Sequence, residues 1–341
     1  MKTLMNQLSN KTTPIVCALF AILAILAAPG AFAANGPDTW VGNTSVNLNV
    51  AANWTGVNAP PIAGDDWIFG TAGSFGAVLD NSYAGGITVS NILFNGPGAF
   101  TFTDNAITLP HSITNASTAL QTFNVPITIS APATVSLTAG GGDLTLGGPV
   151  SCSSALTLAG AGNLTLTNVS TSFTGSITNG ANVTLILTNG AALGGGSAGA
   201  YTWNAVANAV FTNFGVFVYS STATNTFGPR CDGPGPMIIN GPGEFISSPT
   251  YSWGNSGNIT INGGIFSQQK GIPGNARSGW GATTVDGRTI TVNSGGIASL
   301  DAAYAFGQIQ TPPFFHNLVF VANTNGLLRI TAGNCVFSNI L

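Results

Sequence analysis

Charged side chains are scarce in this sequence. Only 5% of its residues are Asp, Glu, Lys or Arg, against about 25% in an average soluble domain. No Lys or Arg occurs between Lys11 and Arg230, and the segment from Leu144 to Pro229 also lacks Asp, Glu and His. The small excess of acids provides no basic face, which excludes nucleic acid and anionic lipid as expected partners. The outer surface must be built from Ser, Thr, Asn and Gly.

Cysteine is also rare and widely spaced. Cys17 lies in the N-terminal apolar run, and the rest of the chain has Cys152, Cys231 and Cys335. An odd number at this spacing excludes a dense disulfide scaffold, and the lack of CxxC or HxxxH pairs excludes metal sites of the usual spacing. We expect buried thiols, leave open whether any two of the three pair, and expect no cofactor.

Amphipathic helices are missing as well. No useful window beyond the N-terminus has a 3.6-residue apolar period, and the 46 glycines and 18 prolines oppose long helices. The 44% of hydrophobic residues and low net charge predict a folded chain. Short alternating segments bounded by Gly, Asn, Ser or Pro predict strands. They are ITL at 107–109, ITI at 127–129, VSL at 135–137, LTL at 144–146, 156–158 and 164–166, and VTLIL at 183–187.

These strand segments recur at a regular spacing. Ile107 and Ile127 are 20 residues apart, as are Leu144 and Leu164. Self-similarity at a fixed period of this length is typical of a solenoid in which each repeat forms one coil. The sequence therefore predicts an all-β parallel β-helix with coils of about 20 residues and a filled interior.

The best-matched pair of repeats predicts which side chains face the core. GDLTLGGPVSCSSALTLAGA (142–161) aligns with GNLTLTNVSTSFTGSITNGA (162–181). In the second repeat Leu164 and Leu166 are expected to point inward and Thr165 outward, because successive strand residues face opposite sides. Asn and Thr stacked from coil to coil would form ladders that satisfy polar groups without charges.

A later pair of repeats carries an insertion. NITINGGIFS (258–267) is similar to TITVNSGGIAS (289–299), but about 31 residues separate the two. The extra residues, 268–288, are expected to form a loop on one face, which in repeat proteins is often the binding face.

The N-terminus has the features of a secretory signal peptide. Lys2 and Lys11 precede an apolar run that begins at Ile15 and is broken at Pro29, and a small-x-small site follows. The run is shorter than the ~20 residues of a membrane-spanning helix. We expect cleavage after Ala33, with an uncleaved anchor helix as the alternative. The mature chain is then exported, to the extracellular space or outer cell surface, with no membrane segment.

Two segments resemble a known family. GAGNLTLTNVSTSFTGSITNGANVTLIL (160–187) is similar to the unit of the autotransporter-associated β-strand repeat of exported bacterial surface proteins. The matching positions are Gly160, Gly162, Leu164, Leu166, Phe173, Thr174, Gly175, Asn179 and Gly180, while Val169 and Ser172 depart from the pattern. The Trp-rich segment 39–70 resembles the part that often follows the signal in such proteins. The resemblance implies a right-handed parallel β-helix that serves as a passenger or stalk, without catalytic residues.

These observations divide the chain into four parts. They are the signal peptide (1–33), a Trp-rich N-terminal cap with the first coils (34–100), regular coils (101–200), and less regular coils (201–341) with the loop insertion 268–288. The cap is expected to shield the open edge of the first coil.

Few residues could carry acid–base chemistry. Asp65 and Asp66 are expected to cap a turn, with calcium binding as the alternative. His111 and His316 are expected at a solvated or core edge. A β-helix polysaccharide lyase or hydrolase would have to assemble its site within 230–301, from residues such as Glu244, Asp286 and Arg288.

The predicted function is structural: a non-catalytic, adhesin-like passenger or stalk at the cell surface. One alternative is a carbohydrate-binding surface module in which Trp253 and Trp280 stack on sugar rings of surface glycans. The other is the polysaccharide lyase or hydrolase. The sequence does not identify the partner or the mode of surface attachment.

Overall fold

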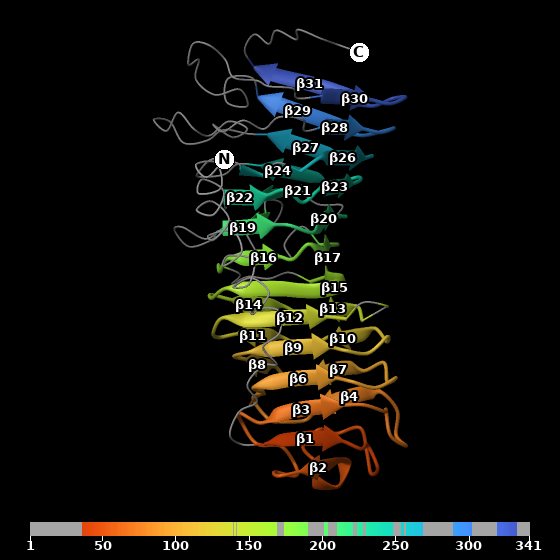
Figure 1. The fold of residues 1–341 in the computed structure, drawn as a ribbon, viewed down its shortest axis with the longest axis vertical. Coiled ribbons are helices and arrows are strands. Elements are labelled where there is room, and N and C mark those ends of the chain that lie inside the picture. Colours follow the sequence, from red (N-terminus) through yellow and green to blue (C-terminus); the bar gives the residue numbers. More distant parts are fainter. Residues whose placement is uncertain are drawn as a thin grey trace, which may run out of the picture.

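Parallel strands stack along one long axis, from the N-terminal cap at one end to β30 and β31 at the other (Figure 1). The computed structural model describes residues 36–138, 140, 142–168, 174–189, 201–203, 210–220, 224–227, 230–247, 254–255, 257–268, 289–301 and 319–332. Within these residues the helical content is one short 3-10 turn, η1 (Ala51–Asn53). The fold is the parallel β-helix that the repeats predicted.

Sheet A, the first face of the solenoid, begins with a hairpin. β1 (Pro37–Trp40) pairs antiparallel with β2 (Trp54–Gly56) on one side and parallel with β3 (Asp66–Phe69) on the other. β2 therefore covers the edge that β1 would otherwise leave open. The face continues through β6 (Asn91–Phe94), β9 (Ser112–Asn115), β12 (Ala133–Leu137), β15 (Leu156–Leu166), β16 (Ile177–Asn179), β19 (Val210–Asn213), β22 (Arg230–Gly233) and β25 (Gly254–Asn255).

Sheet B is the second face. Its strands are β4 (Val78–Asn81), β7 (Thr101–Asp104), β10 (Gln121–Phe123), β13 (Leu144–Leu146), the second half of β15, β17 (Asn182–Leu187), β20 (Val216–Tyr219), β23 (Met237–Asn240), β26 (Ile259–Asn262), β28 (Thr289–Val292) and β30 (Val319–Ala322). The first half of β15 pairs with β12 and β16, and its second half with β13 and β17. This long strand joins both faces into one hydrogen-bonded sheet of 21 strands.

The third face is built by two separate sheets. In the lower coils it is sheet C, with β5 (Ile87–Thr88), β8 (Ile107–Leu109), β11 (Ile127–Ile129) and β14 (Val150–Cys152). In the upper coils it is sheet D, with β18 (Tyr201–Trp203), β21 (Thr224–Phe227), β24 (Glu244–Ser247), β27 (Ile265–Gln268), β29 (Ile297–Asp301) and β31 (Leu327–Ala332).

The repeat alignments read from the sequence correspond to strand pairs. Ile107 lies beside Ile127 in the β8–β11 pair, and Leu144 beside Leu164 in the β13–β15 pair. The later repeats also stack, since β26 pairs with β28 and β27 with β29. Backbone hydrogen bonds between coils thus follow the spacing of the sequence.

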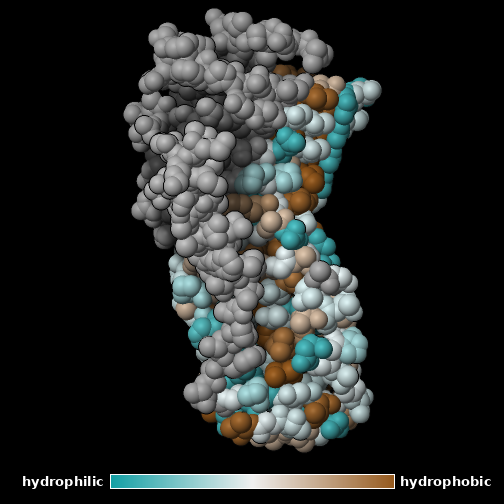
Figure 2. Space-filling model, in the orientation of Figure 1, coloured by the Kyte–Doolittle hydropathy of each residue, from teal (hydrophilic) through white to brown (hydrophobic). Residues whose placement is uncertain are grey.

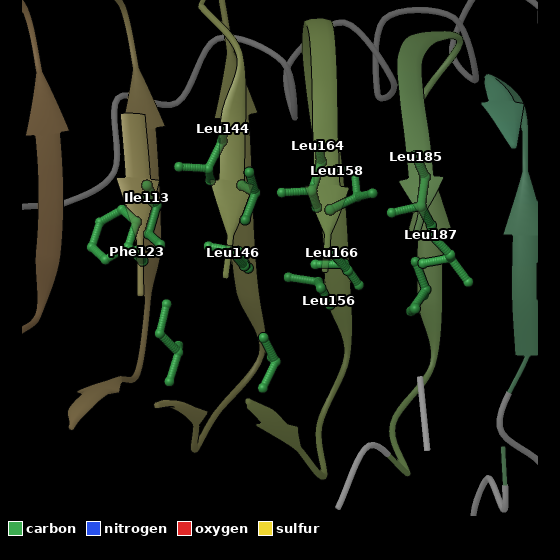
Figure 3. Packing of buried hydrophobic residues seen from close by; sticks show 14 of the residues in the cluster. Ile113, Phe123, Leu144, Leu146, Leu156, Leu158, Leu164, Leu166, Leu185 and Leu187 are labelled. Carbon is green, nitrogen blue, oxygen red and sulfur yellow. The ribbon is translucent and has the colours of Figure 1, made fainter. Parts of the chain in front are cut away.

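Leucine rows fill the middle of the core. Leu164 and Leu166 are buried, whereas Thr165 is partly exposed, as predicted. Leu144 and Leu185 lie on either side of Leu164 in neighbouring coils (Figure 3). Burying each such side chain contributes about 1.5–3 kcal/mol relative to leaving it in water, so the stack is stabilised one coil at a time.

Aromatic rings replace leucine near the N-terminal end. Phe102 stacks on Phe123 with ring centroids 4.4 Å apart, and Phe69 contacts Phe94 at 5.4 Å. Below them the Trp-rich segment is a cap, as predicted: Trp40, Trp54 and Trp67 are buried.

One coil is longer than the sequence analysis anticipated. Asn179 of β16 and Asn213 of β19 are neighbours in the stack although 34 residues separate them. The extra residues have no alternating pattern that would have revealed where the coil resumes. At the predicted insertion, Asn262 and Asn293 stack across 31 residues.

The structure does not test the predicted signal peptide or its cleavage after Ala33. The proposed signal peptide, residues 1–33, lies outside the described residues. In the part of the chain that is described, no helix has the length and apolarity needed to cross a membrane.

Candidate functional site

The residues predicted to contact glycans are not described by the structure. Trp253 and Trp280 both lie outside the described residues, as does the insertion beyond Gln268. The same holds for Asp286 and Arg288 of the hypothetical lyase site.

Glu244, the remaining member of that hypothetical site, has a structural partner. It opens β24, and its Oε1 accepts a short hydrogen bond from the hydroxyl of Ser267 in the next coil. One coil further on, Arg329 donates from Nε to Ser299 Oγ at 3.1 Å. Ser267 and Ser299 are both buried. The side chains of Glu244 and Arg329 thus hydrogen-bond to serine hydroxyls of neighbouring coils.

Asp65 directly precedes β3 and Asp66 is its first residue, and the two carboxylates have different partners. Asp65 caps a turn: its Oδ2 accepts the backbone N–H of Ile62 at 2.7 Å. Asp66 Oδ1 accepts Nδ2 of Asn91 at 2.7 Å. Both carboxylates are buried. Among the described residues no group of three or more His, Cys, Asp or Glu could hold a metal ion.

Asp65 has a second neighbour that sequence reasoning missed. The buried carboxyl of Asp38, on β1, shares a hydrogen-bonding partner with Asp65. Asn58 joins the two, since its backbone N–H donates to Asp38 Oδ1 at 3.0 Å and its Nδ2 to Asp65 Oδ1 at 3.1 Å. Burial raises the pKa of Asp38 to about 6, Asp65 adds to the rise, and the Asn58 N–H opposes it.

His111 meets a serine, but the pair is not arranged for nucleophilic catalysis. Its Nδ1 lies 3.0 Å from Oγ of Ser90 in the coil below. A catalytic serine must be reachable by the substrate carbonyl, and Ser90 is only 2% exposed. His111 itself is exposed, which agrees with the predicted solvated edge, and His316 lies outside the described residues.

Cys152 is a buried, unreactive thiol. Its Sγ donates to the carbonyl of Ser154 at 3.3 Å, and it forms no disulfide. Burial raises its pKa, which keeps the thiol protonated. The side chain of Cys231 and the whole of Cys335 are outside the described residues.

Uncharged polar ladders line the outside of the solenoid. Asn240, Asn262, Asn293 and Asn323 form an amide ladder, in which each Nδ2 donates to the Oδ1 below at 3.0, 2.5 and 2.5 Å. Hydroxyl columns run along the other faces: Thr88, Thr108, Thr128 and Ser151 on sheet C, and Thr134, Thr157, Thr178 and Thr212 on sheet A. The visible described surface mixes pale and teal areas with scattered brown ones (Figure 2). The predicted Asn ladder is confirmed, and the Thr side chains stack in register as predicted.

The described titratable side chains therefore serve contacts within or between coils. No protein-family model, curated protein or solved structure matches this chain.

Proposed function

We propose that this chain is a structural, non-catalytic passenger or stalk that is exported and displayed at the cell surface. The observation that carries the proposal is the continuity of the strand pairing: sheet B runs in parallel from β4 to β30 through every described coil. Each coil contacts its neighbours through backbone hydrogen bonds and buried apolar side chains, and such a stack behaves as a stiff rod.

The chemistry of the described surface supports the same role. Glu244, which sequence reasoning held available for catalysis, is engaged by Ser267 of the next coil. Among the described residues the outer columns are hydroxyls stacked in register and amides bonded from coil to coil, such as Asn262 with Asn293. A rod of this kind stays soluble through uncharged polar groups and holds few groups that could act as a general acid or base.

Surface display is tested by antibody labelling of intact cells that produce the chain. We expect intact cells to be labelled, and Leu23→Arg, which interrupts the apolar run of the N-terminus, to abolish the labelling. Leu23→Val is the matched control and should be displayed normally. Labelling only after lysis would overturn the proposal. Electron microscopy of the purified protein should show rods.

The lack of catalysis is tested separately, by incubating the purified protein with a panel of polysaccharides and calcium. We expect no new reducing ends and no unsaturated products. Calcium-dependent turnover lost in Arg288→Ala would instead establish the lyase or hydrolase function.

A carbohydrate-binding module is the second candidate, favoured by the insertion. Asn262 and Asn293 stay stacked across it, and β26 and β28 stay in register, so the coil accommodates the extra residues without a break. Binding to glycans without turnover, lost in Trp280→Ala and retained in Trp203→Ala, would establish this function in place of a purely structural one.

A further inference from the structure

The strongest unexplained feature of the molecule is the carboxyl pair beneath the cap hairpin (β1 and β2, residues 37–56). Asp38 and Asp65 are both fully buried. Two carboxylates in contact repel each other strongly in a medium of low dielectric. A buried pair of this kind persists only if something positive neutralises one of its members.

Among the residues that the structure describes, no cation forms an ion pair with either carboxyl. Asp38 faces Gly56 across the β1–β2 pair and Trp67 across the β1–β3 pair. The titratable groups on the surrounding elements are Asp65, the buried Asp66 at the start of β3, and the hydroxyl of Tyr83. The pKa of Tyr83 is raised by burial and by Asp38 and Asp65. No Lys or Arg occurs between Lys11 and Arg230.

The two carboxyls differ in their hydrogen bonds. Asp65 receives a donor on each oxygen, from Asn58 Nδ2 at 3.1 Å and from the N–H of Ile62 at 2.7 Å. Asp38 receives the N–H of Asn58 on Oδ1, whereas its buried Oδ2 has no partner among the described residues. A proton on Asp38 gives that carboxyl a donor to offer Asp65.

The backbone of β2 lies close against the Asp38 carboxyl. A Cβ added to Gly56 would fall 2.1 Å from Asp38 Oδ1, so only glycine fits here. A change in the charge of the pair would therefore act directly on the β1–β2 hairpin.

We propose that the cap hairpin is a pH-sensitive latch: a proton held between Asp38 and Asp65 keeps it closed in acid, and loss of that proton loosens it toward neutral pH. The folded-state pKa of Asp38 is raised above the value of 3.8 for the free group. The stabilisation of the closed hairpin by this proton is therefore complete below the unfolded-state pKa of Asp38, and it is lost as the pH rises through about 6. Opening would uncover the edge of β3 and the rings of Trp40 and Trp54.

The experiment is hydrogen exchange of the whole chain at pH 5 and pH 7.5, read peptide by peptide, corrected for intrinsic exchange rates and with EDTA present. We expect the equilibrium constant for opening of the cap hairpin to be about tenfold larger at pH 7.5 than at pH 5. The protection of β12 and β15 should be the same at both pH values. Equal protection of the hairpin at both pH values would overturn the latch without use of any variant.

Asp38→Asn identifies the group that titrates. Its Oδ1 can still accept the Asn58 N–H and its Nδ2 can donate to Asp65, so this variant should stay closed at both pH values. Pronounced pH dependence in Asp38→Asn would overturn the assignment. Thr165→Ala, which lies outside the cap and faces outward, is the control, and its hairpin should open with pH as that of the wild type does. If calcium at pH 7.5 restores hairpin protection as acid does, the pair is a cation site and the proton latch is wrong.

Discussion

Asn163 lies directly above Asp143 and donates to both oxygens of its carboxylate. Its backbone N–H reaches Oδ1 at 2.8 Å and its Nδ2 reaches Oδ2 at 2.9 Å. The two residues hold the same place in the repeats GDLTL and GNLTL. Successive repeats are thus complementary at this position, with a carboxylate in one coil and an amide donor in the next.

Asn163→Asp should make this contact repulsive. It replaces a donor with a second carboxylate, and we expect the variant to lose about 1–3 kcal/mol at pH 7. Because one carboxyl of the pair becomes protonated in acid, most of the loss should disappear near pH 4. Thermal unfolding at both pH values measures the effect. Asn163→Ala, which only removes the side-chain donor, is the control and should lose a similar amount of stability at both pH values. If Asn163→Asp is as stable as the wild type at pH 7, the contact does not contribute to stability.

Leu164→Ala should open a cavity in the middle of the stack. Leu164 is fully buried, and truncations of this kind cost about 2–5 kcal/mol. Thr165→Ala, one residue along but facing outward, should change stability by less than ~0.5 kcal/mol. Solenoids need not unfold in two states, so hydrogen exchange in β13, β15 and β17 is the measurement. Equal protection in both variants would contradict the inward assignment.

Gly160→Ala should damage the coil at the centre of β15. Gly160 has φ of +86°, and an added Cβ would lie 1.8 Å from the carbonyl oxygen of Leu137. Strain and collision together should cost more than ~2 kcal/mol. Gly70→Ala is the control, because its φ is not positive and its Cβ would meet only Asn95 Oδ1 at 3.5 Å. The measurement is the denaturant midpoint of each variant, and equal midpoints for the two would refute the prediction.

Asp104→Asn should stabilise the protein at neutral pH. Burial raises the pKa of Asp80, and the neighbouring Asp104 adds to the rise. A raised carboxyl pKa means stability that is present below the unfolded value and lost as the pH increases. The variant removes the repulsion, and Asn tolerates the φ of +80° found at Asp104. Its melting temperature should exceed that of the wild type at pH 7 and converge with it near pH 4; the same gap at both pH values would exclude an electrostatic cause.

The sequence alone determined the stack wherever the chain repeats itself. In a solenoid each strand pairs with the equivalent strand of the next repeat. The residues that pair can therefore be found by counting one repeat length along the sequence. Leu144 lies beside Leu164 for this reason. The inward and outward assignment of Leu164 and Thr165 then follows from the two-residue period of a strand.

Tertiary structure decided the places where the repeat is broken. Asp38 and Asp65 meet because an antiparallel hairpin and a turn fold back on the first coil, and no periodicity relates the two positions. Strand register depends on backbone hydrogen bonds that every repeat shares, whereas these side-chain contacts depend on how non-repeating segments close over the core, which spacing in a sequence does not record.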